Sequence, residues 1–146
     1  HGLSGQKIHR IKRDYRPLPV GPKYRERAMA RFRQDPFVKE IGYKNFLKNV
    51  SGISFPDFFP PIQSLDVSGD RIYVRTFEVK NRKEACIVLS LSGKEIGKTY
   101  LPIVERAPFL AWFLGVRYNT IHDGFFYYLQ EEEDSESWLL FRQKIL

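Results

Sequence analysis

The sequence predicts a mainly β protein built from antiparallel β-meander repeats, with one or two short amphipathic helices in its N-terminal third. From Ile62 onward, apolar residues recur with the period of two that is typical of strands, and short turns rich in polar residues and glycine separate the runs. Before that point, prolines bound the segments whose apolar spacing is helical. With 146 residues, of which 42% are hydrophobic, the chain is long and apolar enough for one folded domain.

We expect four consecutive segments: an extended N-terminal segment or outer strand (1–20), a helical and proline-rich linker (21–61), a β-meander (62–104) and a second, incomplete meander (105–146). Pro22 suits the first turn of a helix over 23–34, and a second short helix is expected over 37–48. Residues 54–61 contain three prolines and three phenylalanines, so this stretch should lie extended against a hydrophobic surface.

The first meander is expected to have four strands, at 62–67, 71–79, 85–92 and 95–101. The loops between them are short, which makes neighbouring strands antiparallel. In the second of these strands, Ile72 and Val74 alternate with Tyr73 and Phe77, so both faces carry bulky side chains. We therefore expect this sheet to be covered on both faces.

The second meander is expected to have strands at 113–119, 124–130 and 138–145, and its sequence parallels that of the first. Residues 70–74 align with 123–127 at a displacement of 53 (123 − 70), and residues 86–89 align with 138–141 at a displacement of 52 (138 − 86). A period near 50 with three or four antiparallel strands per unit is typical of β-propeller blades, which bury their faces against neighbouring blades. The second unit lacks a fourth strand after residue 145, as expected of a closing blade that awaits a partner strand.

Four segments together carry a family resemblance: RDY at 13–15, FPDFFPPI at 55–62, GDRIYVR at 69–75 and LSGK at 91–94. Over most of residues 8–146 the chain resembles the C-terminal part of uncharacterised bacterial six-bladed β-propeller proteins. The resemblance implies that 8–20 form the outer strand of a preceding blade, that the helices decorate the connection between blades, and that 62–101 and 110–146 are the last two blades. About four blades of such a propeller are not present in the chain. Its start, which has no initiator methionine, is accordingly expected to be a cut within a longer chain.

Charge is concentrated at the N-terminal end. Residues 1–48 contain 13 Lys/Arg and 4 Asp/Glu, and the remainder contains 11 and 13, which gives +9 and −2 for the total of +7. Such a segment could attract nucleic acid. Its basic residues, however, alternate with Ala28, Met29 and Phe32 at the spacing of an amphipathic helix, so we expect a solvated helical face and do not expect nucleic acid as a partner.

The single cysteine, Cys86, lies within an apolar run and is expected to be a buried structural thiol. One free cysteine leaves the compartment open, with an exported or periplasmic parent protein as one alternative. No stretch reaches the roughly 18 apolar residues of a membrane-spanning helix.

Candidate ligand-binding residues are His122, Asp123 and Trp138. An adjacent histidine and aspartate could bind a ligand, although Asp-Gly at 123–124 is foremost a hairpin signal. Trp138, together with nearby aromatic residues, could form a stacking surface, although aromatics at strand spacing usually belong to a core. The sequence contains no catalytic or phosphate-loop motif, and the acidic run at 131–134 lacks the spacing of a calcium loop. We expect no catalytic residues, no metal and no cofactor.

Two classes of function remain. The first is a non-catalytic β-propeller-like scaffold or protein-interaction module, whose partners are proteins and which self-associates through open blade edges. The alternative is a fragment of a propeller enzyme or of a small-ligand-binding protein, whose site lay in the channel of the intact parent.

Overall fold

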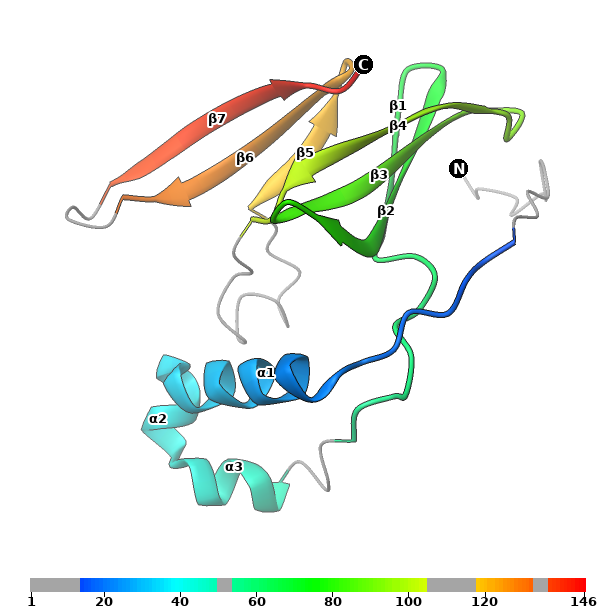
Figure 1. Cartoon of the computed structure of the whole chain (residues 1–146). Helices are drawn as coiled ribbons and strands as arrows, with labels where there is room; N and C mark the ends of the chain where they lie inside the picture. Colours follow the sequence, from blue (N-terminus) through cyan, green and yellow to red (C-terminus); the bar gives the residue numbers. More distant parts are fainter. Residues whose placement is uncertain (1–13, 50–53, 105–117, 133–136) are drawn as a thin grey trace, which may run out of the picture.

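The computed structural model describes residues 14–49, 54–104, 118–132 and 137–146, and places two antiparallel sheets at one end and three short helices at the other (Figure 1). Sheet 1 has the strand order β1-β2-β3-β4, and sheet 2 has the order β5-β6-β7. The strands are β1 (Ser64–Ser68), β2 (Arg71–Lys80), β3 (Lys83–Ser90), β4 (Glu95–Pro102), β5 (Asn119–His122), β6 (Phe125–Glu131) and β7 (Trp138–Lys144). The predicted mainly β class and antiparallel meanders are confirmed.

Strand positions follow the sequence pattern closely in sheet 1 and in the β6–β7 hairpin. The strand expected at 62–67 is β1, which begins two residues and ends one residue later than expected. Gln63 lies before the first paired residue. The expected strand at 113–119 lies outside the described residues except for its last two, and the described strand β5 begins at Asn119. Residues 8–13 of the expected N-terminal strand also lie outside the described residues.

Tight hairpins join three pairs of strands through two-residue loops. At the β5–β6 loop Asp123 and Gly124 have positive φ of 47° and 75°, and at the β2–β3 loop Asn81 and Arg82 have 50° and 58°. Two consecutive residues with positive φ are the signature of the type I′ turn, whose twist matches that of the flanking strands. The Asp-Gly hairpin signal at 123–124 is thus confirmed.

The two sheets pack through one face each, and this contact forms the core. Sheet 1 contributes Tyr73, Cys86, Val88 and Leu101, and sheet 2 contributes Ile121 and Phe126 together with Ile145 beyond β7; all seven are at most 6% exposed. These two buried surfaces are called the inner faces below. The predicted burial of Cys86 is confirmed.

A buried ionic network crosses the contact between the sheets. On β2, Arg75 Nη2 donates to Glu84 Oε2 of β3 at 2.8 Å, and Arg75 Nη1 donates to Asn119 Oδ1 of β5 at 2.7 Å. The guanidinium also lies 5.3 Å from the ring centroid of Phe126. Gln63 Nε2 donates to the other oxygen of Glu84 at 2.9 Å. Arg75 and Glu84 are 6% and 8% exposed, so each needs the other to balance its charge out of water.

One polar and one apolar contact at the edges fix sheet 2 on sheet 1. The backbone N–H of Asp123 donates to Ser68 Oγ at 2.9 Å, which joins the two hairpin turns. On the other side, the Leu146 side chain covers Gly97, with Cδ1 only 2.9 Å from where a Cβ at residue 97 would stand.

The helical segment contains α1 (Pro22–Gln34), α2 (Pro36–Ile41) and α3 (Tyr43–Asn49). The helix beginning at Pro22 is confirmed, but a continuous helix over 37–48 is wrong, because Gly42 takes a positive φ of 80° and separates α2 from α3. Asp35 caps α2 by accepting from the backbone N–H of Phe37 at 3.0 Å. The small helical core includes Val38, which is fully buried, and Phe46, which is 3% exposed.

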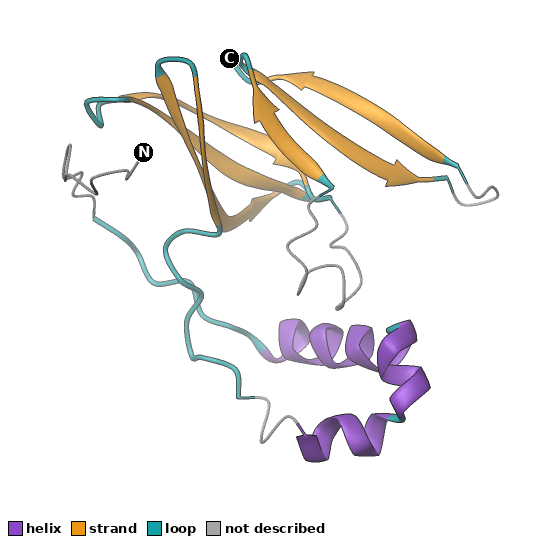
Figure 2. Cartoon of the chain, turned by 180° about the vertical axis from the view of Figure 1, so that it is seen from behind, coloured by secondary structure: helices purple, strands orange, loops and turns teal. Residues whose placement is uncertain are grey.

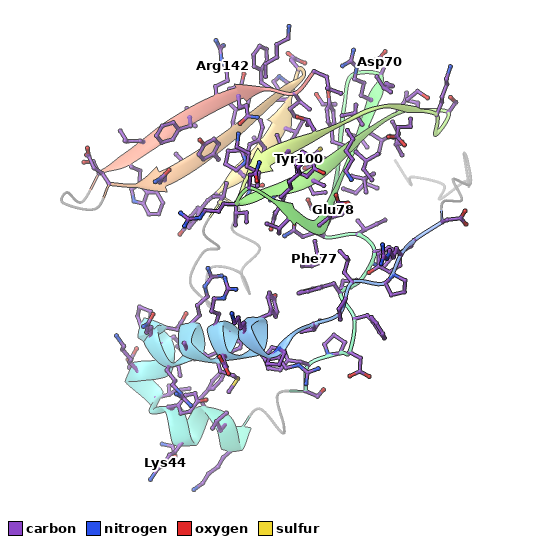
Figure 3. All side chains as sticks on the ribbon, in the orientation of Figure 1. Lys44, Asp70, Phe77, Glu78, Tyr100 and Arg142 are labelled. Carbon is purple, nitrogen blue, oxygen red and sulfur yellow. The ribbon has the colours of Figure 1, made fainter. Side chains whose placement is uncertain are left out.

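Two extended segments, 14–20 before α1 and 54–60 before β1, run side by side in both views (Figures 1 and 2). Their backbones are joined by hydrogen bonds of 2.8 Å from Phe59 N to Leu18 O and from Val20 N to Asp57 O. We call this pair the tether. The Phe59 ring stacks on Phe77 of β2 with a centroid distance of 4.6 Å, and Figure 3 shows Phe77 on the side of sheet 1 that faces the tether. The extended conformation expected for 54–61 is confirmed at these residues.

We predict that Arg75→Ala lowers the free energy of unfolding by about 3–5 kcal/mol, because the buried Glu84 carboxylate then loses its counter-charge. The measurement is urea unfolding followed by circular dichroism. The double variant Arg75→Met/Glu84→Leu should recover much of this loss, because neither charge remains buried. The matched control is Lys98→Ala, which removes the half-exposed ion pair with Glu78 and should change stability by less than about 1 kcal/mol. Equal losses for Arg75→Ala and Lys98→Ala would contradict this role of the buried pair.

We also predict that Cys86 is unreactive in the native protein. Its side chain is fully buried, and burial raises the pKa of the thiol to about 11, so little thiolate exists at pH 8. A chromogenic disulfide reagent should react with less than one tenth of the protein over the time in which a guanidinium-unfolded sample reacts completely, taken as about an hour. Rapid labelling of the folded chain would show that the two sheets open readily.

Candidate interaction surface

The outer face of sheet 1, which points away from sheet 2, is formed by apolar side chains. Strand register places them in two rows across the sheet, Leu65–Val74–Ile87 and Val67–Ile72–Leu89. At the edge strand β1, Leu65 and Val67 are 51% and 58% exposed, whereas on β3 of the same face Leu89 is 4% exposed and Ala85 is fully buried. The predicted coverage of both faces therefore holds on β3, and the exposed part of this face lies toward β1.

A polar cluster borders this surface on β4. Lys98 Nζ donates to both carboxylate oxygens of Glu78 at 2.7 Å, and the Tyr100 hydroxyl donates to Glu78 Oε1 at 2.9 Å. Glu78 and Tyr100 are labelled in Figure 3. The hydrogen bond from Lys98 lowers the pKa of Glu78, and the same bond raises the pKa of Lys98. The carboxylate and the ammonium therefore stay charged and solvated, and the apolar rows end at this border.

The outer face of sheet 2 is richer in aromatic side chains. Strand alternation places on it Phe125, Tyr127, Leu129, Trp138, Leu140 and Arg142. The Arg142 guanidinium covers the Phe125 ring at 4.7 Å, and Trp138 lies 5.0 Å from the ring of Tyr118. Leu140, which is 69% exposed, and Trp138, which is 46% exposed, give this face a hydrophobic centre.

The far ends of β6 and β7 extend beyond sheet 1 in both views (Figures 1 and 2). Side chains on both faces of β7 are therefore exposed at this end: Leu139, on the opposite face from Leu140, is 44% exposed. Within the described residues, β7 pairs with β6 alone, so its other edge has no neighbouring strand there. In sheet 1, by contrast, the third strand β3 pairs with β4 at that edge. Exposed apolar side chains on an edge strand favour association with another polypeptide.

The structure does not bring the three predicted ligand-binding residues together. His122 and Asp123 lie at the β5–β6 turn, with His122 Nε2 3.3 Å from Asp123 Oδ2 and both side chains more than 70% exposed. Trp138 pairs with Glu131 at the opposite end of the β6–β7 hairpin. The seven residues of β6, Phe125–Glu131, separate these ends by about 20 Å. Their roles as ligand-binding residues stay predictions, and they would belong to two sites.

Sequence reasoning missed Arg75 and Glu84, which organise the buried contact between the sheets. They carry no motif, and Glu84 lies two residues along β3 from Cys86, the register partner of Arg75. Sequence reasoning named Trp138 on the outer face of sheet 2 but missed Leu140, because strand alternation alone does not tell which of two faces meets another layer.

In the described part of the chain, no group of three or more His, Cys, Asp or Glu side chains is arranged to hold a metal ion. The same residues include no helix that is long and apolar enough to cross a membrane. Residues 133 and 134, half of the acidic run at 131–134, lie outside the described residues.

Comparison with known proteins gives no match: no family model, no curated protein and no solved structure is significantly similar to this chain. The six-bladed β-propeller resemblance thus stays a prediction, and the surface itself must support any proposal.

We predict that Asp123→Asn leaves stability within about 0.5 kcal/mol of the original, because asparagine suits the left-handed first position of a type I′ turn as well as aspartate does. Asp123→Val should lower the free energy of unfolding by about 1–2 kcal/mol, because a β-branched residue is strained at positive φ. Thermal unfolding of both variants is the measurement. A large loss for Asp123→Asn would show that the carboxylate itself, and not the turn geometry, matters.

Proposed function

We propose that this chain is a non-catalytic, propeller-like scaffold that acts as a protein-interaction module, with the outer faces of its two sheets as the binding surfaces. The single observation that carries the proposal is the exposure of large apolar side chains on both outer faces, at Leu65 and Val67 of sheet 1 and at Trp138 and Leu140 of sheet 2. Contiguous apolar surface of this kind marks sites of protein contact.

The chemistry of the faces favours protein over other ligands. The outer face of sheet 2 combines aromatic rings, leucines and an arginine stacked on a ring, which is the composition of the central part of protein interfaces. The outer face of sheet 1 is aliphatic, and it offers polar groups mainly along the β4 border. An aliphatic sheet face suits the packing of another sheet or helix better than the capture of a small polar molecule.

The predicted repeat also supports this function. The β1–β2 and β5–β6 hairpins both have two-residue loops, and each is followed by a third antiparallel strand in the same order. Sheets that repeat in this way bury their faces against neighbours of the same kind. We propose that the two sheets are blade-like units of a six-bladed arrangement and that the chain self-associates through their open surfaces.

The test is the mass of the purified chain in solution as a function of concentration. Light scattering should give a mass above that of the 17.2 kDa single chain. The double variant Leu65→Lys/Leu140→Lys should return to the single-chain mass, because two charges then interrupt both apolar faces. Leu47→Lys, on α3 and 38% exposed, is the matched control and should behave as the original chain does.

A chain that stays at the single-chain mass up to about 100 μM would contradict self-association as its function. Association that persists unchanged in the double variant would equally contradict the outer faces as the binding surfaces.

A further inference from the structure

We infer that the partner of these surfaces is a second copy of the chain, bound head to tail: the outer face of sheet 2 in one copy packs against the outer face of sheet 1 in the next. The inference rests on the proposed function and adds to it the identity of the partner, the pairing of faces and the direction of the assembly.

The first step is the correspondence between the sheets. The hairpin positions that close each loop are Ser68 and Arg71 in sheet 1 and His122 and Phe125 in sheet 2, a displacement of 54 residues for both pairs. The third strands agree, since Arg71 pairs with Ser90 and Phe125 pairs with Lys144, again 54 apart. Three strands of sheet 2 therefore match three strands of sheet 1 at one constant displacement, in place of the 52 and 53 of the sequence alignment.

Side chains alternate between the two faces of a strand, so the displacement of 54 residues also determines which face of sheet 2 corresponds to each face of sheet 1. Tyr73, on the inner face of sheet 1, corresponds to Tyr127 on the outer face of sheet 2. Phe126, on the inner face of sheet 2, corresponds to Ile72 on the outer face of sheet 1. The contact inside the chain thus joins two different kinds of face, and one of each kind is left open.

The two open faces are consequently of the kinds that already pack together inside the chain. Repeating the internal contact between two copies would place the outer face of sheet 2 on the outer face of sheet 1. A contact between different faces is heterologous, and it continues until the assembly closes into a ring or grows as a filament.

The chemistry at corresponding positions fits this contact. Inside the chain, Arg75 and Glu84 of sheet 1 meet Asn119 of sheet 2. At a displacement of 54, the corresponding residues on the open faces are Leu129 and Trp138 on sheet 2 and Leu65 on sheet 1. The residues at these three positions are polar in the contact inside the chain and apolar in the proposed contact between copies. The proposed contact therefore leaves no buried charge without a partner.

The turn contact has a counterpart too. Ser68 Oγ accepts the backbone N–H of Asp123 inside the chain. At the same displacement His122 corresponds to Ser68, and the backbone N–H of Gly69 corresponds to that of Asp123. A neutral imidazole nitrogen can accept this hydrogen bond, which gives His122 a place at the edge of the contact.

Pairing between like faces is less favourable. Two copies that met through the outer faces of sheet 2 would gather Arg142 and Lys144 of both chains, four cations, in one interface. Head-to-tail packing instead places that face against the aliphatic rows of sheet 1.

The experiment is a complementation test with two single variants. Leu140→Lys blocks the outer face of sheet 2, and Val67→Lys blocks the outer face of sheet 1; the original side chains are 69% and 58% exposed, so both variants should fold. Each variant alone should show the single-chain mass of 17.2 kDa in light scattering, because every head-to-tail contact needs both faces intact. An equimolar mixture should form a complex of twice that mass, because each variant keeps one intact face of opposite kind.

Circular dichroism and thermal unfolding confirm that the variants are folded, and Trp138→Lys with Leu65→Lys provides a second pair if the first does not fold. Either variant forming dimers by itself, with no further change on mixing, would overturn head-to-tail packing in favour of contact between like faces, while self-association as such would stand. A wild-type chain that remains single would instead contradict the proposed function and this inference together.

Discussion

The ion pair between Arg75 and Glu84 is the constraint on which the arrangement of the sheets depends. Both groups are removed from water within sheet 1, and the arginine reaches out of its own sheet to Asn119. A buried guanidinium with fixed partners tolerates few positions of the neighbouring strand. Hydrophobic burial alone would let sheet 2 slide over the inner face of sheet 1, and the directional hydrogen bond to Asn119 selects one position of β5.

Much of the architecture could be predicted because its signals are local. Alternating apolar residues and turn residues are sufficient to locate β2, β3, β4, β6 and β7, and Asp-Gly at 123–124 is sufficient to predict a type I′ hairpin. Pro22 and Asp35 mark helix starts for equally local reasons. The break at Gly42 escaped the pattern because the apolar spacing continues across it.

The packing of the sheets, which decides the faces left outside, was harder to predict, because it depends on contacts between distant residues. Arg75 in a strand is as compatible with a solvated face as with a buried ion pair, and only the three-dimensional approach of Glu84 and Asn119 distinguishes them. The two hairpins close at positions 54 residues apart, Ser68–Arg71 and His122–Phe125, whereas matching the identical letters at Asp70 and Asp123 gives a displacement of 53. One residue of error in a strand exchanges its two faces, so the pairing of faces could not follow from that alignment.

The tether brings the two ends of the helical segment together. Because Val20 and Asp57 are hydrogen-bonded neighbours, the chain leaves the sheet side of the molecule and returns to it at almost one point. The 36 residues between them therefore form an insertion, and its length does not affect the packing of the sheets. Its length and content can change, or a different domain can take its place, while Phe59 on Phe77 keeps the point of attachment and the sheets keep their packing.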